Sequence, residues 1–135
     1  MSLKLDTWKL NVNGYEGTLT IQSVNEYGAV QGFMSSGREV TALNFVGIWD
    51  DTAHSISFGP LIQPPLGPGD ILPVEIREFY RGFLFSTPAI PELGQDVLWT
   101  LSGFFEVTDP TRLSIYRANA RRHTFGWSAQ ITEVA

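Results

Sequence analysis

The sequence contains no cysteine among its 135 residues. Without cysteine the chain has no disulfide bond, no thiol nucleophile and no zinc site with sulfur ligands, and its redox compartment is left open. Histidine is scarce too: His54 and His123 are the only two, and neither stands in a metal-binding spacing such as H-E-x-x-H. We therefore expect neither a metal site nor a cofactor.

Enzyme signatures are also missing from the sequence. It has no G-x-S-x-G, no phosphate-binding glycine loop and no dinucleotide fingerprint. Asp50 and Asp51 are adjacent acids of the kind that usually form a solvated turn. Glu75 and Glu78 are an odd number of positions apart, so in a strand they face opposite sides. We expect no catalytic residue, and the protein is not predicted to be an enzyme.

Long apolar runs are absent. No run approaches the roughly 18 residues of a membrane span, and the N-terminus lacks the basic and apolar regions of a signal peptide. This predicts a soluble, cytoplasmic chain with no membrane partner, unless residues 1–3 replace a signal peptide that has been removed.

Basic residues are too few for nucleic acid to be an expected partner, since the net charge is −5. One stretch, residues 111–132, has no acidic residue and leaves open single-stranded nucleic acid or another anionic partner, or a face for another subunit. It carries Arg112, Tyr116, Arg117, Arg121, Arg122, Phe125 and Trp127.

What the chain does have is a repeated alternation of apolar and polar residues, which is typical of β-strands. Residues 17–34 predict a hairpin around a turn at 25–28. Further strands are expected at residues 5–12, 40–49, 55–58, 74–85, 97–107 and 124–132. Asp109-Pro110 suits the start of a helix, so residues 111–122 are either a short helix or a hairpin arm.

These elements predict an all-β fold, in which residues 1–135 form a single antiparallel up-and-down β-barrel of about eight strands. A hydrophobic fraction of 43% is enough for one core. Prolines cluster between residues 60 and 73. No central strand tolerates them, and we expect an ordered excursion over one end of the barrel.

Five glycines precede a large apolar residue within the expected strands. The pairs are Gly32-Phe33, Gly47-Ile48, Gly82-Phe83, Gly103-Phe104 and Gly126-Trp127. Glycine can mark the bends with which a sheet closes on itself, which favours a barrel over a sandwich. The alternative is that some of these glycines make room for aromatic neighbours.

The segment TWKLNVNGYEGTLTIQSVNEYGAVQGFM resembles the opening of the avidin and streptavidin proteins, where a tryptophan opens the first strand and a later glycine precedes an aromatic residue. VLWTLSG is similar to that family's tryptophan-bearing strand, and TFGWSAQIT to its closing strand. The resemblance implies an eight-stranded up-and-down barrel that holds a ligand at one open end. It also implies a homo-oligomer, usually a tetramer.

The same resemblance implies four ligand-binding residues. Phe33 falls where the family has a tyrosine that hydrogen-bonds the ligand, and Trp99 matches a tryptophan of the pocket wall. Trp49 and Phe58 are similar in spacing to a second wall pair. Phe33 lacks the hydroxyl, and Leu10 replaces a polar asparagine. These losses argue against biotin, because a site built on buried hydrogen bonds loses most of its affinity without them.

We therefore expect a β-barrel that binds a small apolar or cyclic ligand other than biotin, with Trp49 and Trp99 in one interior. The alternative is a non-catalytic structural or assembly protein whose barrel is filled by its own aromatic side chains. An eight-stranded barrel is compatible with both, since its interior is just wide enough for side chains or one small ligand.

Overall fold

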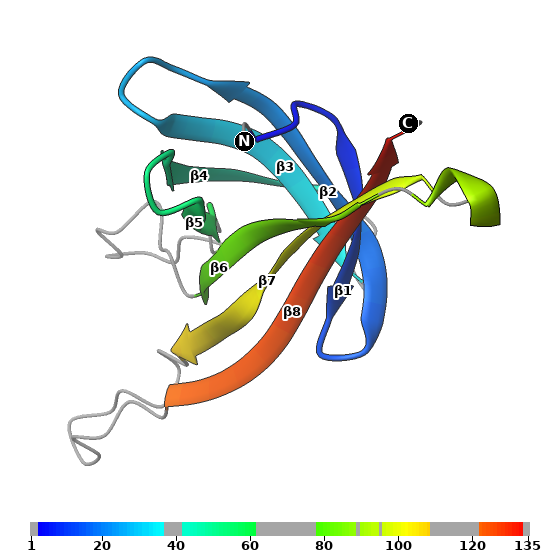
Figure 1. Cartoon of the computed structure of the whole chain (residues 1–135). Coiled ribbons are helices and arrows are strands. Elements are labelled where there is room, and N and C mark those ends of the chain that lie inside the picture. The colour runs from blue at the N-terminus through cyan, green and yellow to red at the C-terminus, as the bar shows by residue number, and fades with distance from the viewer. Residues whose placement is uncertain are drawn as a thin grey trace, which may run out of the picture.

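The structure is a computed structural model that describes residues 3–36, 42–61, 78–88, 90–94, 96–108 and 122–133. Within these residues eight antiparallel strands pair in chain order, and β8 pairs with β1 to close a barrel (Figure 1). The strands are β1 (Thr7–Val12), β2 (Tyr15–Val24), β3 (Ala29–Ser36), β4 (Leu43–Asp50), β5 (Ser55–Pro60), β6 (Glu78–Thr87), β7 (Val97–Thr108) and β8 (Arg122–Glu133). The predicted all-β class and up-and-down barrel are confirmed.

The predicted turns follow from residues that tolerate a positive φ. Asn13 (φ 49°) and Gly14 (φ 90°) form the two-residue turn between β1 and β2. The predicted hairpin over residues 17–34 is confirmed by the pairing of β2 with β3. Alternation then divides the side chains, as in β1, where Trp8, Leu10 and Val12 are buried and the residues between them are exposed.

Some expectations concern residues outside the described part of the chain. β5 ends at Pro60, the first proline of the cluster, and the excursion expected after it lies mostly in residues 62–77, which are not described. Whether residues 111–121 form a helix or a hairpin arm also falls outside the described ranges, whereas Arg122 begins β8. Between β6 and β7 the chain forms a short 3-10 helix, Pro91–Leu93.

Three of the five strand glycines, Gly32, Gly47 and Gly82, lie directly against aromatic side chains. A Cβ atom at Gly47 would lie 2.5 Å from the Cβ of Phe58, and one at Gly82 would lie 2.7 Å from Cζ2 of Trp127. A Cβ at Gly103 would collide with the backbone carbonyl of Arg81. Gly126 differs, since nothing lies within 4 Å of its added Cβ. The sequence left two explanations for these glycines, bends of the sheet or room for aromatic neighbours. The close contacts at Gly47 and Gly82 directly support the second explanation.

An inward glycine places the next residue on the outer face, because side chains alternate along a strand. Ile48, Phe83 and Phe104 follow Gly47, Gly82 and Gly103, and all three are exposed. Gly126 has the opposite phase, and the residue after it, Trp127, is buried.

Aromatic rings fill the barrel interior toward the end that carries the β1–β2 turn. The ring of Phe58 stacks on that of Tyr80 at 4.9 Å and lies 5.0 Å from Phe45 and 5.4 Å from Trp127. Tyr80 in turn stacks on Phe105 at 4.7 Å. This half of the interior is occupied by the protein's own side chains, so any ligand site must be sought nearer the other end. None of the described residues forms a helix of the length and apolarity required to cross a membrane.

Candidate functional site

A pocket of about 640 Å³ opens at the barrel end at which β1 begins and β8 ends. Figure 1 shows how these two strands lie side by side in the barrel. Three segments enclose it: the N-terminal residues before β1, the turn between β2 and β3, and the end of β4. Its lining consists of Leu3, Leu5, Val24, Asn25, Glu26, Tyr27, Gly28, Ile48, Trp49, Asp50 and Asp51. The volume is within the usual range of small-molecule sites, roughly 300–1,000 Å³.

Trp49, on the inner face of β4, is among the residues that line this pocket. Its side chain is buried near the end of β4, and its Nε1 donates a hydrogen bond to Oδ1 of Asp51 at 3.3 Å. The imidazole of His54 stacks against the indole with centroids 6.4 Å apart. The β4–β5 turn therefore holds the indole in place from the side away from the core.

The β2–β3 turn is anchored to Trp49 through the backbone. Asn25 Oδ1 accepts hydrogen bonds from the backbone N–H groups of Tyr27 (3.0 Å) and Ala29 (2.8 Å), which closes the turn. Gly28, at φ 84°, accepts a 2.7 Å hydrogen bond from the Trp49 N–H through its carbonyl oxygen. A Cβ at Gly28 would collide with the carbonyl of Trp49. Glycine is therefore required at this position both by the positive φ and by this close approach.

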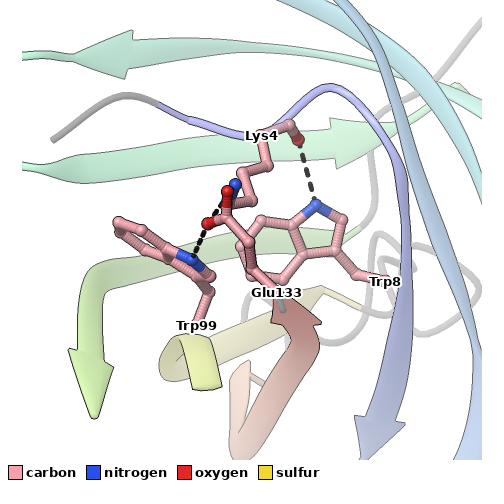
Figure 2. Close-up of polar contacts among 4 residues, drawn as sticks. All are labelled: Lys4, Trp8, Trp99 and Glu133. Carbon is pink, nitrogen blue, oxygen red and sulfur yellow. Dashed lines mark hydrogen bonds and ion pairs between the residues drawn. The ribbon is translucent and has the colours of Figure 1, made fainter. Parts of the chain in front are cut away.

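The N-terminal segment separates the pocket from Trp99. Leu3 and Leu5 line the pocket, whereas Lys4, between them, places its Nζ 5.2 Å from the centroid of the Trp99 ring. Lys4 Nζ also lies 2.6 Å from Oε2 of Glu133, and the Lys4 carbonyl accepts a 3.1 Å hydrogen bond from Nε1 of Trp8 (Figure 2). These contacts tie the segment to the first and last strands of the barrel.

Glu133 is the residue on which this attachment depends. Its Oε2 accepts a hydrogen bond from Nε1 of Trp99 at 2.9 Å, beside the ion pair with Lys4 (Figure 2). The hydrogen bonds from the side chains of Lys4 and Trp99 lower the pKa of the Glu133 carboxyl below its usual 4.5.

Acidification is expected to loosen the N-terminal segment. A carboxyl whose pKa is lowered by folding stabilises the folded state above its unfolded pKa, and that contribution is lost as the pH falls through the lower folded pKa. The Nε1–H resonance of Trp99 should therefore shift in NMR spectra recorded below pH 4.5, and the shift should be absent in Glu133→Gln. A Trp99 resonance that does not titrate would contradict this assignment.

The four residues expected to bind ligand lie in four different surroundings. Trp49 lines the pocket. Phe58 is 2% exposed within the aromatic core, and Trp99, on the inner face of β7, is held by Glu133 on the other side of the N-terminal segment. Phe33 lies on the outer face of β3, half-buried, since its neighbours Gly32 and Met34 are the buried inward positions. Of the four, Trp49 alone is among the pocket's described lining residues.

Sequence reasoning missed the leucines of the N-terminal segment and the β2–β3 turn as parts of the site. Leu5 and Tyr27 are 56% and 85% exposed, and an apolar side chain in a turn or before a first strand is a weak signal that would have pointed to them. The predicted arginine–aromatic stretch lies largely outside the described residues, and within it Trp127 belongs to the core.

The described residues hold no group of three or more acidic, histidine or cysteine side chains that could bind a metal ion. No protein-family model matches this chain, and no curated protein and no solved structure is significantly similar to it. The likeness to the avidin and streptavidin proteins therefore rests on the three sequence segments alone.

Proposed function

We propose that this protein is a non-catalytic barrel that binds a small molecule with an apolar, cyclic body in the pocket beside Trp49. The observation that carries the proposal is the pocket itself: about 640 Å³, with Trp49 in its lining and the backbone-anchored β2–β3 turn at its rim. A ligand ring can contact the part of Trp49 that lines the pocket, and aliphatic groups can contact Leu3 and Ile48.

The charge of the rim restricts the ligand further. Glu26, Asp50 and Asp51 all line the pocket, and no lysine or arginine does among the described residues. Carboxylates concentrated at one opening lower the local affinity for anions and raise it for cations. The preferred ligand is accordingly neutral or cationic, with its charged group near the rim and its ring against Trp49.

Biotin is not the proposed ligand. Phe33 cannot supply the hydroxyl that the resemblance would require, and Leu10, in place of a polar residue, is 1% exposed in the core. Neither side chain belongs to the pocket. The unavoidable carboxylate of biotin would also face three acidic residues at the rim.

A second candidate function has its own support. The stacked rings of Phe58, Tyr80 and Phe105 fill one half of the barrel. A filled barrel suits a structural or assembly role in which the outer surface makes the contacts. The two proposals differ in whether the pocket at the other end takes up a ligand.

Titration with three molecules of similar size tests the binding proposal. Cyclohexanol, cyclohexylamine and cyclohexanecarboxylate are neutral, cationic and anionic at pH 7. We expect the first two to change the tryptophan emission saturably and the carboxylate to bind about tenfold more weakly, a difference of about 1.4 kcal/mol.

Two tryptophan variants locate the response. The emission change should vanish in Trp49→Phe and persist in Trp99→Phe, because the N-terminal segment separates Trp99 from the pocket. Thermal melts of both variants check that each is folded. If none of the three compounds binds at millimolar concentration, or if Trp49→Phe retains the full response, the pocket is not the site and the structural role is favoured.

A further inference from the structure

One wall of the barrel carries an apolar outer surface. Six side chains on β4, β6 and β7 are between 39% and 64% exposed although they are large and apolar. They are Val46, Ile48, Phe79, Phe83, Phe85 and Phe104. We call the outer surface of β4, β5, β6 and β7 that they form the phenylalanine face. The opposite wall instead presents polar side chains such as Lys9, Glu16, Thr18, Gln22 and Gln31.

The register makes this face continuous. Ser57 of β5 lies between Ile48 and Arg81, and Arg81 is paired in turn with Phe104. In the next row Phe83 lies between Ser55 and Ser102. Directly opposed and diagonal residues of neighbouring strands are within reach of aromatic side chains.

In this second row a large ring therefore lies between two small hydroxyl residues. Phe83 is 60% exposed, whereas Ser55 and Ser102 on either side of it have short side chains. A second copy rotated by a two-fold axis near Phe83 can place its own rings over these serines. Such a self-complementary pattern of large and small side chains is what a two-fold interface requires.

The apolar area is close to what a stable dimer buries. Four half-exposed phenylalanines contribute about 400 Å² if a whole side chain buries about 200 Å², and the two aliphatic residues raise the total to roughly 500 Å². Because homodimer interfaces are about 65% apolar, roughly 500 Å² of apolar area corresponds to a whole interface of roughly 770 Å² on each copy. A standard specific interface buries about 800 Å² for each partner.

Charge favours a second copy over a strongly charged partner. The outward charges described on these four strands are Asp50, Arg81 and Glu106, and the first and last lie toward opposite edges of the face. Their sum is −1, compared with −5 for the whole chain. Two copies thus meet with little mutual repulsion, and Arg81 can extend over the ring of Phe104, as arginine often does at interfaces.

We propose that the phenylalanine face is the surface through which two copies of this chain associate. Ile48 belongs both to this face and to the pocket lining, so the second copy stands beside the pocket mouth. The association does not depend on whether the pocket takes up a ligand, and it is tested in ligand-free protein.

Sedimentation equilibrium over a concentration series measures the association. The wild-type chain should be dimeric at 100 µM. A dissociation constant near 1 µM corresponds to an association free energy of about 8 kcal/mol and would already give mostly dimer at this concentration. Phe83→Glu should raise the dissociation constant at least 100-fold. Gln22→Glu changes the charge equally on the opposite wall and should leave it unchanged. Circular dichroism confirms that each variant is folded.

Cysteine scanning gives a second readout that does not remove a contact. Because the chain has no cysteine, Ser102→Cys introduces a single thiol beside the proposed axis. It should form disulfide-linked dimers under mild oxidation much faster than Gln22→Cys. A wild-type chain that is monomeric at 100 µM, or a dimer that survives Phe83→Glu, overturns the proposal. So does a monomer that binds neutral phosphatidylcholine vesicles through Phe83, since the face would then contact lipid.

Discussion

Replacing Gly103 with valine should lower the free energy of unfolding by about 3 kcal/mol or more, at the upper end of the cost of overpacking. Gly103 of β7 is paired with Gly82 of β6, and an added Cβ would meet the carbonyl of Arg81 and, at 2.7 Å, the Cα of Gly82. Backbone atoms cannot rotate away as a flexible side chain can. The sheet itself must shift to admit the new atoms.

Gly126→Ala is the matched control for this substitution. It is also a strand glycine, on β8, but nothing lies within 4 Å of its added Cβ. Alanine there should be neutral or should stabilise by up to about 1 kcal/mol, because it restricts the unfolded chain. Urea denaturation followed by circular dichroism measures both variants. Equal effects at the two positions would show that the close approach at Gly103 carries no energetic weight.

These glycines also show how far the fold could be predicted from the sequence. Alternating apolar residues and short turns were sufficient to predict the strands and their antiparallel order. The closure of the sheet into a barrel was predicted from the strand glycines and from the resemblance to the avidin and streptavidin proteins. The position of a glycine relative to the inner and outer faces requires the register. Gly82 and Gly126 both precede an aromatic residue, yet Phe83 is exposed and Trp127 is buried.

The candidate site was harder to predict for the same reason. Phe33 was expected to contact ligand, but Gly32 occupies the inward position of β3 and leaves Phe33 on the outer face. For Trp49 the sequence allowed two strand registers, one that places its side chain on the inner face and one that places it on the outer face. The structure has the first. The pocket depends further on Leu3 and Leu5, and an exposed apolar side chain before the first strand is only a weak signal that this segment lines a pocket at the barrel end.

The expectation for Phe58 leads to the second large effect. Phe58→Ala should lower the free energy of unfolding by about 3–5 kcal/mol, the usual cost of removing a buried phenylalanine ring. The side chain is 2% exposed and contacts the rings of Phe45, Tyr80 and Trp127. Alanine would leave a cavity that these packed rings can fill only in part.

Phe83→Ala removes the same ring from the outer face and is the matched control. Because Phe83 is 60% exposed in a single chain, its loss should cost less than about 1 kcal/mol in dilute protein, where no second copy covers it. Guanidinium denaturation at sub-micromolar concentration, followed by tryptophan emission, measures both variants. If instead Phe58→Ala costs no more than Phe83→Ala, the interior around Phe58 is not tightly packed and a ligand space in the barrel centre regains support. A large difference would leave the pocket beside Trp49 as the place to seek the ligand, because the centre of the barrel is then already full.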